Sequence, residues 1–449
     1  MQYVALKVAI LISILKIMKR KGNIMIDNPN KKIYVKGGRQ LNGEVEVDGS
    51  KNSALVCMAA ASLATDGSVV KLYNVPDISD IIIMTEILRL LGKTIEFENG
   101  VMSLSGEIKS YEVPLDLAGS IRGSVYCMGV LIGLLGNANC GLPGGDKIGE
   151  RPIDIHLQAF EMMGAKYKER GGKVELYAKD GLQGKSIYLR FPSVGATCNI
   201  MLAAASAQGK TVIINAAKEP EIVDLSNLLV KMGVKVVGAG SDRITIYGSR
   251  NISGGIKHDV IADRIETGVF LAATTITGGE VMVKNCVPYH NFPLISTLRR
   301  IGAEIEEGGD DSILIKSTGK QLQPFNVSIM PFPGVATDLQ PILAIIATKS
   351  KGESVITDHV FPERFQYIFE LIRMGARIDH YGNMLKIQGG GKLHGIPVEG
   401  NDIRAVTSLI CAGLIANGIT EIDGIYHMER GYKALIEKLV YLGADIKIK

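Results

Sequence analysis

The stretch KNSALVCMAAASLATDG (residues 51–67) determines how this chain folds. It opens on two polar residues, continues as a run that is apolar on every side, and closes on a glycine. A helix without a polar face is buried all round, and a glycine after the last turn is a common helix stop. The stretch therefore predicts a helix inside a protein core, with Lys51 and Asn52 at its N-terminal end.

The same pattern recurs along the chain. Apolar runs headed by a polar group also begin near Arg122, Ser193, Arg264, Asp338 and Arg404. The first four starts, at 51, 122, 193 and 264, are 71 residues apart. Glycines that end amphipathic helices form a second marker, with intervals of 68 to 73 residues, at positions 92, 164, 233, 302, 375 and 443. Two markers with one period indicate six internal repeats.

Each repeat predicts a βαβαββ unit. A short β-branched strand follows the buried helix, and then come a second helix with one apolar face and alternating strand pairs such as KVELYA (173–178). Six buried helices are too many for one core in a chain of 449 residues. We therefore expect an α/β (α+β) fold with two lobes of three units, an inside-out α/β barrel in which sheets and amphipathic helices surround three buried helices.

The order of the repeats predicts the lobe boundaries. The first lobe is expected over residues 51–262 and the second over residues 31–50 and 263–449. The second is discontinuous because an N-terminal hairpin, from KIYVKGG (32–38) to GEVEVDG (43–49), precedes the first repeat and is expected to close the lobe of the last three. Such a chain passes between the two lobes twice, and we expect a hinged cleft between them.

Residues 1–30 are predicted to be a leader outside both lobes. The apolar run at 4–18 is short for a membrane span, contains Lys7 and Lys16, and has its basic cluster after it rather than before it. This is not the order of a signal peptide. We expect Met25 to be the working start, and an amphipathic anchor with a basic flank is the alternative.

Composition excludes several classes of protein. Lys plus Arg number 50 and Asp plus Glu 46, so the net charge of +4 is far from the basic stripe of a nucleic-acid surface. The six cysteines form no CxxC pair and have no metal-ligand spacing. Free buried thiols in a reducing cytoplasm, with no metal, are expected. Nothing in the sequence indicates an oligomeric state.

The polar heads of the buried helices are the first candidates for a functional site. Three-fold packing would bring them to one end of each lobe, where helix N-termini add partial positive charge and unpaired N–H groups. Lys51, Arg122, Arg264 and Arg404 add full charges. If the lobes face each other at these ends, the cleft binds anions; the alternative is that these residues are helix caps and surface charges.

Two carboxylates are candidates for proton transfer. Asp146 lies in LPGGDKIGERPID (142–154), a glycine-rich loop, and Asp338 lies at the start of a buried helix. One acid on each side of a cleft could give and take protons at opposite ends of a substrate. An aspartate near a helix start is otherwise usually a cap.

Nine motifs, in this order over residues 31–449, resemble the enolpyruvyl transferases: GEVEVDGSKNSAL, IRGSVYCMG, LPGGDKIGERPIDIH, FPSVGAT, AKEPEIVDL, DRIETG, ATDLQ, DIRA and YHMERGY. The resemblance implies two lobes around a cleft. It also implies transfer of enolpyruvate from phosphoenolpyruvate to the 3-hydroxyl of UDP-N-acetylglucosamine through a tetrahedral ketal, without metal or organic cofactor, in peptidoglycan precursor synthesis.

The resemblance also implies roles for individual residues. It implies Asp146, Asp338, Lys51 and Arg430 as catalytic groups, with Asp338 taking the hydroxyl proton. Phosphoenolpyruvate and phosphate would contact Lys51, Arg122, Arg151, Arg404 and Arg430. The sugar nucleotide would contact Asn52, the segment Arg151, Pro152, Ile153, Asp154 and Ile155, and the segment Ser193, Val194 and Gly195. Asp338 and Val360 would contact the sugar, and Arg364 and Asp402 would close around the ligands.

Departures from the family pattern leave alternatives open. The family most often has cysteine at the position of Asp146, and a free carboxyl has a pKa of about 3.9 against about 8.5 for a thiol. Differences at Gly123, Val335, Ala336 and Asn401 lie beside sugar-facing positions. Alternatives are therefore a transferase for another alcohol such as shikimate 3-phosphate, an RNA 3'-phosphate cyclase, and a non-catalytic paralogue.

Overall fold

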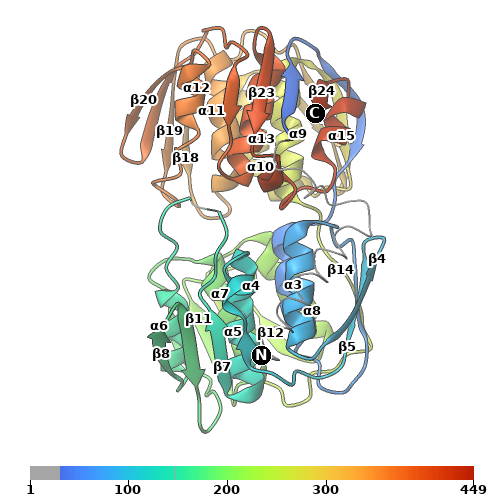
Figure 1. The fold of residues 1–449 in the computed structure, drawn as a ribbon, viewed down its shortest axis with the longest axis vertical. Helices are drawn as coiled ribbons and strands as arrows, with labels where there is room; N and C mark the ends of the chain where they lie inside the picture. Colours follow the sequence, from blue (N-terminus) through green and yellow to red (C-terminus); the bar gives the residue numbers. More distant parts are fainter. Residues whose placement is uncertain (1–30, 147) are drawn as a thin grey trace.

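The computed structural model of the protein describes residues 31–146 and 148–449. The expected leader and the expected start at Met25 lie outside the described residues. Figure 1 shows two lobes, one above the other along the long axis of the molecule. None of the helices in the described ranges is long and apolar enough to cross a membrane.

Three buried helices form the centre of each lobe. In the helix that begins at Lys51, every residue except Asn52 is buried, which confirms the prediction from its uniformly apolar sequence. The three helices of each lobe pack against one another. They are α2 (Lys51–Ala61), α5 (Tyr126–Leu135) and α7 (Val194–Ser206) in the first lobe, and α9 (Arg264–Thr277), α11 (Gln340–Lys349) and α13 (Ile403–Ile415) in the second.

Amphipathic helices cover these centres. In the helix over Phe292–Ile301, Leu294, Leu298 and Ile301 are buried while Arg299 and Arg300 are exposed. All six glycines of the second marker have positive φ, between 92° and 115°, which explains why glycine recurs there. These helices are α3 (Ser79–Leu90), α6 (Asp154–Met162), α8 (Pro220–Lys231), α10 (Phe292–Ile301), α12 (Ile368–Arg373) and α15 (Leu435–Tyr441), with short helices α4 (Leu115–Ala118), η1 (Arg122–Val125), η2 (Pro288–Asn291), η3 (Thr337–Leu339) and α14 (Ile425–Met428).

Six four-stranded sheets complete the units, each with one parallel and two antiparallel pairings. In the first lobe the orders are β14 (Lys257–Asp259), β3 (Val70–Tyr73), β5 (Val101–Ser105), β4 (Thr94–Glu98); β6 (Glu112–Val113), β7 (Asn137–Gly141), β9 (Lys173–Tyr177), β8 (Lys166–Arg170); and β10 (Ser186–Tyr188), β11 (Lys210–Ile214), β13 (Arg243–Tyr247), β12 (Lys235–Val237). In the second they are β2 (Leu41–Glu46), β15 (Gly279–Lys284), β17 (Ser312–Ser317), β16 (Glu304–Glu307); β18 (Asn326–Ile329), β19 (Glu353–Asp358), β21 (Met384–Gln388), β20 (Arg377–Tyr381); and β22 (Pro397–Glu399), β23 (Ile419–Asp423), β1 (Ile33–Lys36), β24 (Asp445–Ile448).

The N-terminal strands do not form the expected hairpin, so that prediction was wrong. β1 lies between β23 and β24, whereas β2 pairs with β15 in another sheet of the same lobe. The chain leaves β1 through Gly37, where an added Cβ would lie 2.2 Å from the carbonyl oxygen of Ala416. Each strand finds its partner in a different repeat, and local sequence does not specify such long-range pairing.

Two segments connect the lobes. β2 in the second lobe precedes α2 in the first, and β14 in the first precedes α9 in the second. The connecting segments lie against each other, since Ser50 N–H donates to Ile261 O over 2.7 Å and Asp263 N–H to Asp48 O over 2.9 Å. One apolar core is drawn from residues 54–260 and the other from 33–47 and 262–446. We propose that these two units are the domains of the chain.

Candidate active site between the lobes

A cavity of about 490 Å³ lies between the lobes. Residues at the starts of the six buried helices line it, which agrees with the expectation from their repeated positions. These residues are Lys51, Arg122, Ser193, Arg264, Asp338 and Arg404. Six helix N-termini around one hollow, four of them with a Lys or Arg at the helix start, favour an anionic ligand.

Capping residues fix where the helices begin. Ser50 accepts a hydrogen bond from the N–H of Ser53, so Lys51 is the first residue of α2. Asp402 Oδ1 accepts from the N–H groups of Arg404 and Ala405, at 2.8 and 3.2 Å. The cap thereby places the Arg404 side chain at the cavity.

Most of the residues selected from the sequence line this one cavity. Ile153 and Asp402 do not: the Ile153 side chain packs in the core of the first lobe, and Asp402 caps α13. The residues that line it are Lys51, Asn52, Arg122, Asp146, Arg151, Pro152, Asp154, Ile155, Ser193, Val194, Gly195, Asp338, Val360, Arg364, Arg404 and Arg430.

Carboxylates pair with several of the cavity cations. Lys51 Nζ lies 3.4 Å from Asp80 Oδ2, and Arg430 Nη1 lies 2.6 Å from Asp146 Oδ1. Arg264 Nε lies 3.1 Å from Glu221 Oε1. Buried charges without partners are costly, so these carboxylates stabilise the cations at the cavity.

Arg122 and Arg151 have no carboxylate partner among the described residues. Burial, and then the neighbouring Arg151, lower the pKa of the Arg122 guanidinium to about 10. Burial and then Arg364 lower the pKa of Arg151, whose guanidinium lies over the Phe361 ring at 5.7 Å. Two neighbouring half-buried guanidinium groups repel each other, and an anion between them would remove that repulsion.

Asp338 is held by two arginines. Its Oδ1 lies 3.0 Å from Arg364 Nη2 and 3.1 Å from Arg404 Nε. Burial alone would raise the pKa of this carboxyl, but Arg404 and Arg364 outweigh burial and hold the pKa far below its usual range. Asp338 is therefore ionised, as a proton acceptor must be, and an anionic ligand that draws the arginines away would make it a stronger base.

Sequence reasoning did not select several residues that line the cavity. Asp80 contacts two cations that lie 29 and 350 residues away in the sequence, so no local motif could indicate it. Glu219 and Glu221 lie in AKEPEIVDL, a motif of the resemblance to which no role was given. Phe332 lines the cavity and its N–H donates to Glu219 Oε1 over 3.2 Å, across the two lobes.

His156, which also lines the cavity, makes stability sensitive to acid. It is buried, and its Nδ1 accepts from the Asn199 amide over 3.0 Å. Burial, and then Arg122, lower the pKa of His156 to about 3. The unfolded chain, with a histidine pKa of about 6.5, binds more protons below that pH, so stability is complete above about pH 6.5 and falls towards pH 3.

We expect this histidine to contribute a slope of up to about 1.4 kcal/mol per pH unit over that range. Urea denaturation of His156→Gln at several pH values should show a flatter acid dependence than the parent protein. The matched control is His394→Gln, since His394 is exposed. Equal slopes in the two variants would contradict this assignment.

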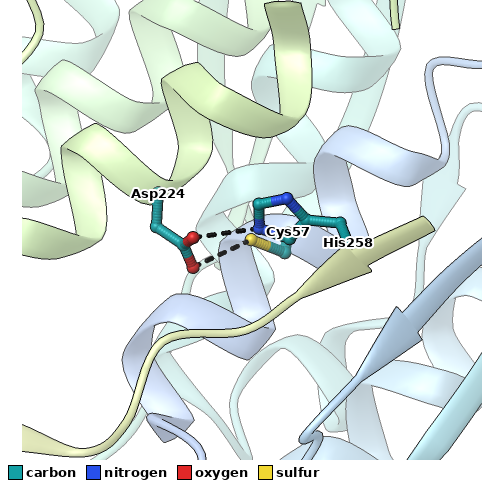
Figure 2. Close-up of side chains that lie close together, drawn as sticks. All are labelled: Cys57, Asp224 and His258. Carbon is teal, nitrogen blue, oxygen red and sulfur yellow. Dashed lines mark hydrogen bonds and ion pairs between the residues drawn. The ribbon is translucent and has the colours of Figure 1, made fainter. Parts of the chain in front are cut away.

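A polar cluster with one residue each from α2, α8 and β14 is shown in Figure 2: Cys57, Asp224 and His258. They are buried, and their possible ligand atoms lie within 4.8 Å of one another, so the group could hold a metal ion. The sequence analysis missed it because the three residues are far apart in the chain. Lys231 Nζ lies 3.5 Å from His258 Nδ1, which leaves the proton on Nε2, and Nε2 donates to Asp224 Oδ1 over 2.9 Å.

These hydrogen bonds use the lone pairs that an ion would need. Asp224 also accepts from the Ser53 hydroxyl, from Cys57 and from the Ile261 N–H. Burial, and then Asp224, raise the pKa of the Cys57 thiol well above its usual range, so it is protonated. The cluster is a hydrogen-bonded anchor that joins α8 to the start of α2, two residues after Lys51, and to a segment between the lobes.

Asp224→Ala is expected to destabilise the protein by about 3–5 kcal/mol. The substitution removes the acceptor of His258, of the Ser53 hydroxyl and of the Ile261 N–H. Urea denaturation against Asp180→Ala, at an exposed aspartate, measures the difference. A loss of stability no greater than in that control would show that Asp224 is not the centre of the cluster.

Comparison with known proteins agrees with this fold. A family model described as EPSP synthase (3-phosphoshikimate 1-carboxyvinyltransferase) matches residues 35–439. UDP-N-acetylglucosamine 1-carboxyvinyltransferase from Finegoldia magna is 44% identical over 418 residues, 92% of this chain and 98% of the relative. UDP-N-acetylglucosamine 1-carboxyvinyltransferase 1 from Staphylococcus aureus is 42% identical over 419 residues, 93% of this chain and 99% of the relative.

Solved structures show the same fold. The enolpyruvyl transferase NikO from Streptomyces tendae has a TM-score of 0.84 at 26% identity, and the match covers 93% of this chain and 99% of NikO. EPSP synthase from Acinetobacter baumannii has a TM-score of 0.75 at 20% identity, covering 94% and 100%. The two-lobed fold is thus that of the enolpyruvyl transferases as a class. Within that class, the chain belongs to the family of UDP-N-acetylglucosamine 1-carboxyvinyltransferases.

Proposed function

We propose that this protein transfers the enolpyruvyl group of phosphoenolpyruvate to the 3-hydroxyl of UDP-N-acetylglucosamine and releases inorganic phosphate. The observation that carries the proposal is that Asp146, Asp338, Lys51 and Arg430, from both lobes, line one cavity whose cations suit an anionic donor. The names of the relatives, which cover almost the whole chain, support the choice of acceptor.

The reaction has two steps. The sugar hydroxyl oxygen attacks C2 of the donor and loses its proton to Asp338, while C3 gains a proton from the carboxylic acid form of Asp146. In the resulting tetrahedral ketal, C3 returns its proton to the Asp146 carboxylate, and the C2–O bond to phosphate breaks while the leaving phosphate takes the proton held by Asp338. The double bond is restored, and the enolpyruvyl ether and phosphate leave.

The cations stabilise charge through these steps. The donor carries a carboxylate and a phosphate, and arginine forks bind both groups in a bidentate way. Arg122 and Arg151 lack carboxylate partners among the described residues. An anion should therefore bind most favourably beside these two side chains. Lys51 and Arg430 would stabilise the charge that develops as the ketal forms.

The product would be a peptidoglycan precursor, and we place the reaction in the cytoplasm. All six cysteines are buried and free, which suits a reducing compartment. The reaction as written is a proton and group transfer without net oxidation or reduction. The partners are the two small-molecule substrates.

Release of phosphate from phosphoenolpyruvate tests the proposal. The assay is run from mildly acid to neutral pH with UDP-N-acetylglucosamine, with shikimate 3-phosphate, and without an acceptor. We expect release that depends on the UDP-sugar, at a kcat in the ordinary enzymatic range of about 1–10³ per second. Release that depends only on shikimate 3-phosphate would show that shikimate 3-phosphate is the acceptor. If folded protein shows no release that depends on an acceptor, the transferase activity is refuted.

A further inference from the structure

Asp80 is a buried carboxylate at the start of α3, with 3% of its surface exposed. The rest of α3 is an ordinary outer helix that packs against α2. A buried carboxylate costs several kcal/mol unless cations or hydrogen-bond donors satisfy it. The groups that satisfy Asp80 therefore indicate why it lies there.

The two oxygens of Asp80 contact cations from different lobes. Oδ2 lies 3.4 Å from Lys51 Nζ in the first lobe, and Oδ1 lies 3.0 Å from Arg430 Nε in the second. The preceding residue adds to this junction, since the N–H and hydroxyl of Ser79 both donate to Glu429 O, at 3.5 and 3.4 Å. The start of α3 is thus docked on the segment that carries Arg430.

Arg430 has a second carboxylate partner on a glycine-rich loop. Its Nη1 lies 2.6 Å from Asp146 Oδ1, and among the described residues its Nη2 has no hydrogen-bond partner. The ion pair between Arg430 and Asp146 is lost when Asp146 is in the carboxylic acid form that the proposed reaction requires. At that moment Asp80 is the remaining carboxylate that holds the Arg430 guanidinium in place.

We propose that Asp80 is a positioning residue that orients Lys51 and Arg430 and holds the second lobe against the first during the reaction. The inference rests on the proposed enolpyruvyl transfer for its kinetic consequences. Its structural consequence, a contact that keeps the lobes together, does not depend on which acceptor is used. The same carboxylate thereby holds the lobes together and orients the side chains of Lys51 and Arg430.

The variants are chosen to separate charge from shape. Asp80→Asn keeps the size of the side chain and removes its charge, and Asp80→Glu keeps the charge. The matched control is Asp77→Asn, three residues earlier in the same segment, since no contact of Asp77 with Lys51 or Arg430 is present. Circular dichroism gives the folded fraction, to which all rates are normalised.

Kinetics are the first measurement. We expect Asp80→Asn to lower kcat about 10- to 100-fold, because displacement of catalytic groups by about 1 Å costs up to about 100-fold. KM for phosphoenolpyruvate should change much less, since Lys51 and Arg430 keep their positive charges, and Asp80→Glu should recover part of kcat. A purely structural role would lower the folded fraction and leave the normalised kcat at the value of Asp77→Asn, which would overturn the proposal.

Small-angle X-ray scattering with both substrates present is the second measurement. We expect a larger radius of gyration for Asp80→Asn than for Asp77→Asn, because the lobes lose a contact. Equal radii of gyration for the two variants would show that Asp80 does not hold the lobes together. If the parent protein shows no acceptor-dependent phosphate release, the proposed function fails, and scattering without substrates still tests whether Asp80 holds the lobes together.

Discussion

Replacing Asp338 by asparagine is expected to lower kcat about 10²- to 10⁴-fold, the usual contribution of a general base. The asparagine keeps the shape of the side chain but takes no proton from the sugar hydroxyl. It also leaves Arg364 and Arg404 without the carboxylate that lies 3.0 and 3.1 Å from them. Two unpaired arginines attract anions more strongly, so binding of phosphoenolpyruvate should be kept or tightened while the chemical step slows.

Steady-state phosphate release and calorimetric binding of phosphoenolpyruvate separate these two effects. Asp379→Asn is the matched control, since Asp379 is exposed on β20 and does not line the cavity. A kcat for Asp338→Asn that stays close to that of the control would remove Asp338 from the chemical step. A parallel loss of binding and kcat would assign it instead to holding the ligand.

The fold could be predicted from the sequence because its signals are local and repeated. A helix apolar on all sides has one stable environment, and each of the six glycine stops at 92, 164, 233, 302, 375 and 443 marks a backbone position with φ near 100°. Six copies of both signals establish the units and their number. The starts of the buried helices were also predicted from the repeats, and these residues line the cavity.

The parts that the sequence did not predict depend on contacts between distant segments. The pairing of β2 with β15 and of β14 with β3 exchanges strands between repeats, and both partners look like ordinary local strands. The family resemblance implied ligand contacts for Ile153 and Asp402, but the Ile153 side chain packs in the core of the first lobe and Asp402 caps α13. Asp80 was missed because its partners Lys51 and Arg430 are brought to it only by packing of the two lobes.

The loop acid should set both the pH optimum and the response to an epoxide. Asp146 lies between two glycines with positive φ, Gly145 and Gly149, and a Cβ added at Gly149 would lie 3.0 Å from Glu363 of the second lobe. The loop thus carries its acid to the boundary between the lobes. Carboxyl groups ionise with a pKa of about 4 and thiols near 8.5, so an enzyme that needs the protonated form of a carboxyl should work best at lower pH than one that uses a thiol.

Asp146→Ala is therefore expected to lose about 10²- to 10⁴-fold in kcat, as for removal of a general acid. Asp146→Cys is expected to retain activity with an optimum at higher pH than the parent, although it loses the contact with Arg430. A thiolate is a far better nucleophile towards an epoxide than a carboxylate, so fosfomycin should form a stable adduct with Asp146→Cys and none with the parent or with Asp146→Ala. Intact-mass measurement after incubation reports the adduct directly. An adduct on the parent at Asp146, or identical pH profiles for the parent and the cysteine variant, would mean that this loop does not supply the proton in the way that its position at the cavity implies.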